Sequence, residues 1–334
     1  MALSSSLPVS AKNSTNVRAV ERDPDFRAWV SETLAAIDAL EGAVPAPPVA
    51  PRAAAAPWYL RAGFATLGTL APPLATAWAE RLFLTAPRPP APPKEVAALA
   101  TAHAGSVIVD GLRLATWTWV PLRHPDVPRS TVLLVHGWGG RGGQLAGFVP
   151  GLLAAGHAVV TFDAPGHGAS EGRTSSLVEV GRAVRGVAAA LPSPVHAVIA
   201  HSMGGAATAL ALDAGLALAR AVFVAPPRAA SEWVHTFSAV LGLSDEVRDG
   251  MQRNIEGRLQ VSWDDLDMAT VAPRMQTPLL VIHDTDDKEV PYAGSSATVA
   301  AWPGASLHTT AKLGHKRILD DADVIARAVA FVVA

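Results

Sequence analysis

Residues 195–205 read Val195-His196-Ala197-Val198-Ile199-Ala200-His201-Ser202-Met203-Gly204-Gly205, an apolar strand that breaks on a serine and restarts as a helix. A serine hydroxyl is a poor nucleophile unless a sharp turn presents it to a base, and a strand–serine–helix turn does this. The helix also directs its first free N–H groups toward a developing oxyanion. Small residues two before and two after the serine, Ala200 and Gly204, allow strand and helix to approach closely. The run therefore predicts a nucleophile elbow at Ser202.

Composition limits what the rest of the chain can be. The 334 residues are long enough for one large α/β domain with an insertion, or for two modest domains. Half of the residues are hydrophobic, and the net charge of −2 argues against an electrostatic nucleic-acid binder. Cysteine is absent, which excludes thiol catalysis, disulfides and cysteine-based zinc sites.

The N-terminal part differs from the rest of the chain in composition and sequence pattern. Residues 1–23 are rich in Ser and Ala and lack the apolar core of a secretory signal, so we expect a flexible tail and a cytoplasmic protein. Residues 24–101 predict a helical, proline-rich extension. Its expected elements are a helix over 24–41, a Pro/Ala linker over 44–57, two short amphipathic helices within Trp58–Leu84, and a second proline-rich linker over 87–93.

The Trp58–Leu84 stretch is the most apolar part of that extension. Arginine, glutamate and proline interrupt it, so a membrane-spanning helix is not expected, while peripheral contact with a membrane stays open.

From about Thr101 onward, strands and helices alternate. Expected strands are Ser106–Val109, Leu112–Val120, Thr131–Val135, Ala158–Phe162, Val195–Ala200, Ala221–Ala225, Pro278–His283 and Ala305–Thr310. Expected helices are Gln144–Ala155, Ser175–Leu191, Met203–Leu218, Tyr292–Trp302 and Ala322–Val333. Residues 226–276 interrupt the rhythm with helical patterning and no strand. This alternation predicts a doubly wound, mostly parallel sheet over 102–334, with 226–276 as a helical cap insertion.

In such sheets, reactive groups gather beyond the carboxyl ends of the strands. The loop after Thr131–Val135 reads His136-Gly137-Trp138-Gly139-Gly140, and its glycines free a backbone N–H, that of Trp138, to face an oxyanion. The second oxyanion donor would be the N–H of Met203. The loop Asp163-Ala164-Pro165-Gly166-His167-Gly168 is expected to be scaffold beneath the site and to do no chemistry.

Two later loops supply an acid and a base. A histidine base needs a fixed carboxylate that holds its tautomer. The loop Asp284-Thr285-Asp286-Asp287-Lys288-Glu289-Val290-Pro291 offers several, of which Asp287 is favoured and Asp286 is the alternate. Of eleven histidines, His315 is predicted to be the base because it follows Gly314 in a loop after the last strand.

The order Ser202, Asp287, His315, together with the HGWGG turn, the DAPGHG loop and the AHSMGG elbow, resembles the α/β-hydrolase fold superfamily, and its serine esterases and lipases in particular. The resemblance covers about residues 102–334. The chain departs from the usual pattern at Ala200, where glycine is usual, and at His283-Asp284, where His-Gly is common. A serine hydrolase of this kind needs neither a metal nor an organic cofactor.

The resemblance implies cleavage of carboxylic esters through an acyl-enzyme on Ser202, with His315 as base and Asp287 as orienting acid. Alternatives on the same residues are a thioesterase, a lipase or lysophospholipase, a peptidase and a C–C hydrolase. An alternative of another class is a catalytically silent binding protein that docks through its N-terminal helices. Trp233, Phe237 and Leu241 of the cap are expected to line a pocket for a hydrophobic ester. The oligomeric state is left open.

Overall fold

The computed structural model describes residues 56–121 and 130–334. The expected flexible tail over 1–23, the helix over 24–41 and most of the linker over 44–57 lie outside the described residues.

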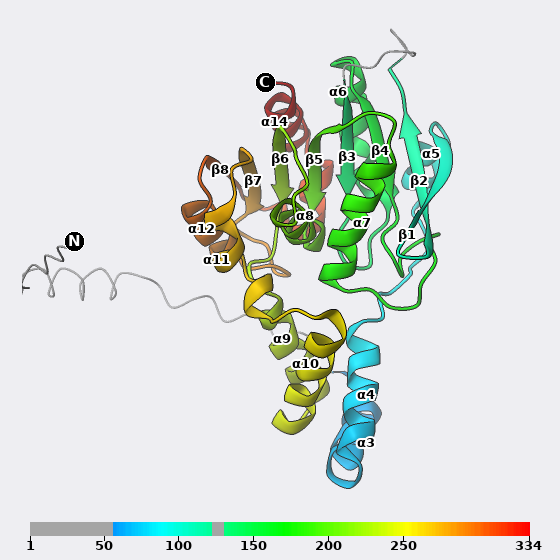
Figure 1. Ribbon diagram of the computed structural model, residues 1–334. Helices are drawn as coiled ribbons and strands as arrows, with labels where there is room; N and C mark the ends of the chain where they lie inside the picture. The colour runs from blue at the N-terminus through cyan, green and yellow to red at the C-terminus, as the bar shows by residue number, and fades with distance from the viewer. Residues whose placement is uncertain (1–55, 122–129) are drawn as a thin grey trace, which may run out of the picture. The chain divides into compact units, whose positions relative to one another are not determined.

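Within these residues, eight strands form one sheet in the order β1-β2-β4-β3-β5-β6-β7-β8 (Figure 1). The strands are β1 (His103–Val109), β2 (Leu112–Trp119), β3 (Thr131–Val135), β4 (Ala158–Phe162), β5 (Val195–His201), β6 (Arg220–Val224), β7 (Leu279–Asp284) and β8 (Ala305–Thr310). Strands β1 and β2 form the predicted antiparallel hairpin, and β2 pairs antiparallel with β4. All pairings from β4 to β8 are parallel. The predicted mostly parallel sheet is confirmed.

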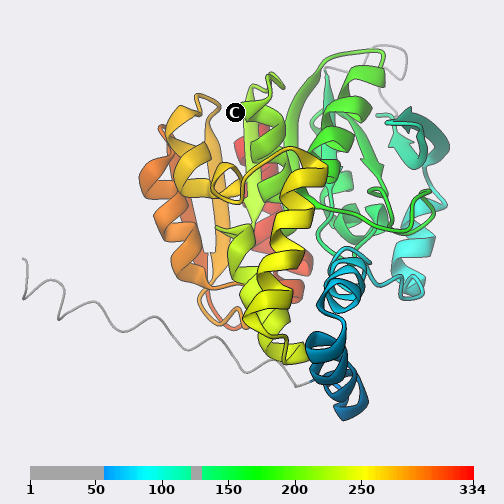
Figure 2. The same cartoon turned by 60° about the horizontal axis from the view of Figure 1, so that its bottom comes forward.

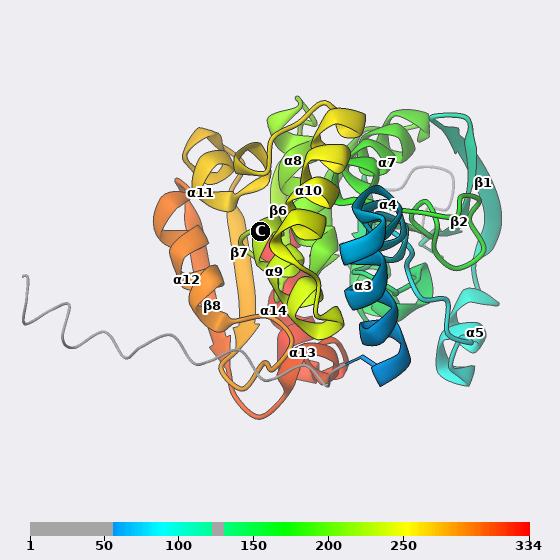
Figure 3. The same cartoon turned by 90° about the horizontal axis from the view of Figure 1, so that it is seen from below.

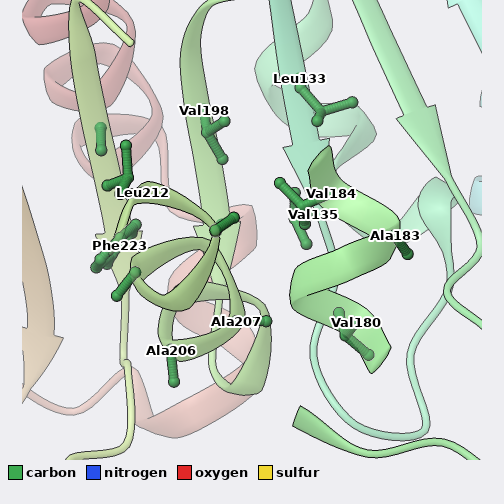
Figure 4. Close-up of a cluster of buried hydrophobic side chains, with 14 of the residues drawn as sticks. Leu133, Val135, Val180, Ala183, Val184, Val198, Ala206, Ala207, Leu212 and Phe223 are labelled. Atoms are coloured by element: carbon green, nitrogen blue, oxygen red, sulfur yellow. The ribbon is translucent and has the colours of Figure 1, made fainter. Parts of the chain in front are cut away.

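Helices cover both faces of the sheet. The α-helices of the described chain are α3 (Trp58–Leu70), α4 (Pro72–Phe83), α5 (Pro93–Leu99), α6 (Val149–Ala154), α7 (Leu177–Ala190), α8 (Met203–Asp213), α9 (Ala230–Leu241), α10 (Asp245–Leu259), α11 (Met268–Val271), α12 (Tyr292–Ala301), α13 (Gly314–Arg317) and α14 (Ala322–Val333). Helices α7 and α8 pack on one face against strand residues such as Val135 and Val198 (Figure 4). Helix α11 contributes Met268 and Val271 to the same cluster. Helices α6 and α14 pack on the other face. The fold is therefore doubly wound.

The continuous apolar strands explain why this sheet forms. Strands β3, β4 and β7 are buried along their whole length, as expected of parallel strands with helices on both faces. Between β3 and β4, the single predicted helix is instead a 3₁₀ helix over Gly142–Phe148 followed by α6. Pro150 lies in the first turn of α6, where its missing N–H is tolerated, and it cannot continue a helix from upstream.

Residues between β6 and β7 contain α9, α10, α11 and two 3₁₀ turns, Asp264–Leu266 and Ala272–Arg274, without a strand, as the sequence predicts. Helices α9 and α10 do not pack alone. They share a third hydrophobic cluster with α3 and α4, which contains Phe64, Ala79, Val234 and Met251. Figures 2 and 3 show α3 and α4 lying beside α9 and α10 at one end of the sheet. None of the helices in the described part of the chain is long and apolar enough to cross a membrane.

Candidate active site

Ser202 stands at the junction of β5 and α8 with backbone angles φ 51° and ψ −126°. A non-glycine residue rarely adopts a positive φ, and such strain collects at functional sites. The Ser202 N–H donates to the carbonyl of Val224 on the neighbouring strand at 2.8 Å, which holds the turn in place. Gly204 permits the close approach, because a β-carbon there would lie 2.6 Å from the carbonyl oxygen of His136. The local backbone is that of a nucleophile elbow.

His315 lies between the serine and the acid loop. Its Nε2 is 3.0 Å from Ser202 Oγ, and its Nδ1 is 2.7 Å from Asp287 Oδ2. The sequence placed His315 in a glycine-hinged loop, whereas the structure places it in the short helix α13, directly after Gly314. All three side chains are almost fully buried. The structure thus brings His315 to Ser202 across 113 positions of the sequence.

Asp287 is held by more than one histidine. Its Oδ1 accepts hydrogen bonds from the N–H groups of Glu289 and Val290 at 2.8 and 2.9 Å. Its Oδ2 lies 3.2 Å from His283 Nε2 in addition to His315. Burial alone raises the pKa of the Asp287 carboxyl, but the hydrogen bonds from His283 and His315 outweigh it and hold that pKa well below its usual range. Asp287 is therefore ionised at neutral pH.

The ionised acid determines the tautomer of His315. A carboxylate only accepts hydrogen bonds, so the proton of the neutral imidazole resides on Nδ1 and is donated to Asp287. Nε2 is then free to accept the hydroxyl proton of Ser202. This is the arrangement a general base requires.

Asp286, the alternate acid, is not directed at His315. Its Oδ2 accepts a hydrogen bond from the backbone N–H of Lys312 at 2.8 Å. Asp284, at the position where glycine is common, is fully buried and accepts hydrogen bonds from the Thr310 hydroxyl and the Leu313 N–H. Both carboxylates therefore bind the segment that leads into His315, a role the sequence analysis did not identify.

His201, next to the serine, contacts His315 from the opposite side. Its Nε2 donates to the His315 carbonyl at 3.0 Å, and the two rings lie 4.6 Å apart between centroids. Burial, followed by the neighbouring charge of His315, lowers the pKa of His201 to about 3. His201 is a neutral support for the backbone of His315.

Met203 directly follows Ser202, and Trp138 lies in the turn that approaches Ser202 from the end of β3. Met203 is the first residue of α8, so its N–H has no partner within the helix. Trp138 follows Gly137, where a β-carbon would come within 2.8 Å of the Ser202 β-carbon. Trp138, Ser202 and Met203 all line one cavity. Backbone donors beside a serine in an enclosed space are suited to stabilising an oxyanion.

The Asp163–Gly168 loop is held by hydrogen bonds within itself and to neighbouring turns. The Asp163 carboxylate accepts hydrogen bonds from the N–H groups of Gly142 and Ala169, each at 2.7 Å. His167 Nδ1 donates to the Pro165 carbonyl. Burial, then the charge of His136, lowers the pKa of His167 to about 4. These contacts give the loop a structural place beneath the site.

The cavity at Ser202 has a volume of about 350 Å³ and an apolar lining. Trp233 and Phe237 of α9 line it as expected. Leu241 is a correction: it is not a lining residue, and its side chain is buried in the cluster that joins α9 to α3 and α4. The reason is helical geometry, because the apolar surface of α9 spans two adjacent faces. Val234 and Leu241 are buried in the cluster and do not line the cavity. Trp233 and Val240 line the cavity, and Phe237 lines it while also packing against the cluster.

Sequence reasoning missed one wall of this cavity. Leu82, Phe83 and Leu84, at the end of α4, also line it, across from α9. Helical periodicity marks α4 as amphipathic, but nothing in the sequence indicates which surface a separate N-terminal helix covers.

Among residues 56–121 and 130–334, no cluster of His, Asp and Glu side chains is arranged to hold a metal ion.

Comparison with known proteins identifies the family of the chain. A family model described as the alpha/beta hydrolase family matches residues 132–328, more than half of the chain. A search of curated proteins found no match.

Solved structures share the fold at low sequence identity. Est1E of Butyrivibrio proteoclasticus, with ferulic acid bound, is 18% identical, with a TM-score of 0.52 over 69% of this chain and 100% of that one. An esterase of Exiguobacterium antarcticum is 13% identical, with a TM-score of 0.53 over 70% of this chain and 100% of that one. A bacterial membrane phospholipase A is 18% identical, with a TM-score of 0.53 over 82% of this chain and 96% of that one.

Proposed function

Because the chain belongs to the alpha/beta hydrolase family, we propose that it is a serine hydrolase that cleaves carboxylic esters. The observation that carries this proposal is the pair of hydrogen bonds that links Ser202 Oγ to His315 Nε2 and His315 Nδ1 to Asp287 Oδ2. A strained, buried serine that is hydrogen-bonded to an oriented histidine is the arrangement that catalyses acyl transfer in serine hydrolases.

In the proposed mechanism, Ser202 Oγ attacks the acyl carbonyl while His315 Nε2 takes the hydroxyl proton. The negative charge on the carbonyl oxygen is stabilised by the N–H groups of Met203 and Trp138, each contributing about 3–4 kcal/mol in the transition state. The C–O bond of the ester then breaks, and His315 gives its proton to the departing alcohol. Water, activated by His315, releases the acid and restores Ser202.

Asp287 orients His315 and stabilises the imidazolium that forms during the reaction. Its low pKa keeps it ionised throughout, so it does not take the proton itself. The substrate we propose is a hydrophobic ester, because the cavity beside Ser202 is lined by Trp233, Phe237 and other apolar side chains.

The test is hydrolysis of p-nitrophenyl esters set against acyl-thioesters by wild-type protein and Ser202→Ala. We expect ester hydrolysis by the wild type and its loss in Ser202→Ala. Ser193→Ala, in the exposed loop before β5, is the matched control and should retain activity. Faster turnover of thioesters would assign the same residues to a thioesterase. A wild-type protein inactive on both series, with Ser202 unreactive, would favour the binding-protein alternative.

A further inference from the structure

The cavity that Ser202 borders is apolar. Ser202, Met203 and Trp138 line it, and helices α4 and α9 supply further lining residues. The hollow that His315 borders is a different one: Ser202 is not part of its lining, which is charged and of mixed sign, with Asp286 and Glu289 beside Lys288, Lys312 and Arg317. An ester that reacts at Ser202 therefore lies against the apolar cavity.

This position assigns the acyl half of the ester. In the proposed mechanism the acyl group stays attached to Ser202 while the alcohol departs, so the acyl group occupies the apolar cavity beside Ser202.

The wall of the acyl cavity that faces α9 comes from the N-terminal extension. Phe83 of α4 packs edge-to-face on Phe237 at 5.2 Å and on Trp263 at 6.3 Å between ring centroids. These three rings form an aromatic contact between α4 and the helical insertion, and all three residues line the cavity.

This wall is anchored to the sheet-bearing part of the chain. The carbonyl of Leu84 accepts a hydrogen bond from the Ser175 N–H at 2.7 Å. Four residues further on, the Arg88 side chain donates to the carbonyls of Gly166, Ser170 and Gly172. The end of α4 is therefore held in position relative to Ser202.

The cavity volume limits the length of the acyl chain. An apolar cavity of about 150 Å³ in another protein holds one benzene ring. A volume of about 350 Å³ holds roughly twice as much hydrocarbon, which corresponds to a medium-length chain. An acetyl group would leave most of the cavity empty, and a palmitoyl group would exceed it.

We infer that this site takes an ester of a medium-chain fatty acid, and that Phe83 of the N-terminal helix α4 sets the chain length. The inference rests on the proposed ester hydrolysis at Ser202. On this inference, the N-terminal extension selects the substrate together with the helical insertion, because both line the acyl cavity.

The experiment measures kcat/KM for p-nitrophenyl acetate, butyrate, octanoate, dodecanoate and palmitate. We expect the wild type to prefer octanoate over acetate and over palmitate by roughly tenfold or more, since each buried methylene contributes about fourfold. Phe83→Ala should move the optimum to dodecanoate or longer. Phe83→Trp should move it to butyrate. Leu74→Ala, an exposed position on the same helix, is the control and should keep the wild-type profile.

Thermal melting of each variant checks that it is folded, and Phe83→Trp serves if Phe83→Ala is not.

The outcomes separate the inference from the function on which it rests. A wild type that hydrolyses none of the esters contradicts the proposed function, and the inference with it. An active wild type that favours acetate, or Phe83 variants with the same profile as Leu74→Ala, overturns the inference and leaves the hydrolase proposal standing.

Discussion

The carboxylate of Asp284 accepts a hydrogen bond at 3.0 Å from the N–H of Leu313, which lies 29 residues later and two residues before His315. The same oxygen accepts from the Thr310 hydroxyl at 2.8 Å. Burial alone raises the pKa of Asp284, but hydrogen bonds from Gly314, Thr310, Leu313 and Asp286 outweigh it and lower that pKa. An ionised carboxylate at the end of β7 thus fixes the turn that carries the proposed base.

Asp284→Asn tests this positioning. The NH₂ group of the asparagine would face at least one of the N–H or O–H groups that donate to Asp284, and that hydrogen bond would be lost. We therefore expect the free energy of unfolding to fall by about 1–3 kcal/mol. Because the turn loosens, kcat should fall about tenfold while KM changes little. Asp267→Asn, which alters a carboxylate that accepts the Ala269 N–H in the helical insertion, is the matched control. An unchanged kcat in folded Asp284→Asn would refute the positioning role.

Asp287→Asn tests the orienting acid. Its amide can donate to His315 Nδ1, which favours the tautomer with the proton on Nε2, the wrong nitrogen for a base. We therefore expect kcat to fall by about 10²–10⁴-fold, with circular dichroism showing an intact fold. Asp286→Asn is the neighbouring control and should lose less than tenfold, since Asp286 binds the Lys312 N–H and not His315. The opposite ranking would make Asp286 the acid.

Three buried histidines predict loss of stability in mild acid. The pKa values of His136 and His167 are lowered to about 4 and that of His201 to about 3, in each case mainly by burial. The unfolded chain binds these protons below about pH 6.5, and the folded chain does not until about pH 4. Their stabilising contribution is therefore complete above pH 6.5 and declines as the pH falls toward 4.

Within that window, each of these histidines lowers the free energy of unfolding by about 1.4 kcal/mol for each unit by which the pH falls. Urea unfolding between pH 7 and pH 4 measures the slope. His167→Gln should reduce this slope by the contribution of about one proton. Leu152→Ala, which truncates a buried apolar side chain, should instead lower the free energy of unfolding equally at every pH. A slope in His167→Gln equal to that of the wild type would contradict the assignment.

Substitutions at two glycines, Gly204 in the elbow and Gly257 in α10, should have opposite effects on stability. At Gly204 an added β-carbon would meet the backbone carbonyls of His136 and Val135 at 2.6 and 2.7 Å. We expect Gly204→Ala to destabilise the protein by more than about 1–3 kcal/mol and to abolish activity, because strand and helix must separate. Gly257, within α10, has no atom near an added β-carbon, so Gly257→Ala should stabilise by about 0.4–1 kcal/mol. Thermal melting and ester hydrolysis measure both.

The sequence was most informative where burial forces a pattern. Strands β3 and β4 and helix α14 have the predicted bounds, because residues buried on both faces of a sheet, or along one stripe of a helix, must be apolar. Parallel strands then bring their following loops to one edge, which is why Ser202, Asp287 and His315 could be proposed together.

Contacts between distant segments were not predictable in the same way. Phe83 contacts Phe237 across more than 150 residues, and no periodicity in either helix specifies that partner. Phe237 and Leu241 are both apolar and both contact the cluster with α3 and α4, but only Phe237 also lines the cavity, because the packing of α9 decides which of its apolar residues reach it. Nothing in the sequence connects Asp284 to Thr310 and Leu313, its partners on the turn that leads to His315.

The most direct measurement of the central claim is the site of covalent labelling by a fluorophosphonate probe. Trypsin releases Ser202 in the peptide 186–220, which also contains Ser193 and Thr208 as internal controls. The proposed mechanism predicts a single phosphonyl adduct on Ser202, found by tandem mass spectrometry, slowed in His315→Ala and absent in Ser202→Ala. A folded wild-type protein that remains unlabelled, or that carries the adduct on Ser193 or Thr208, would contradict the assignment of Ser202 as the nucleophile.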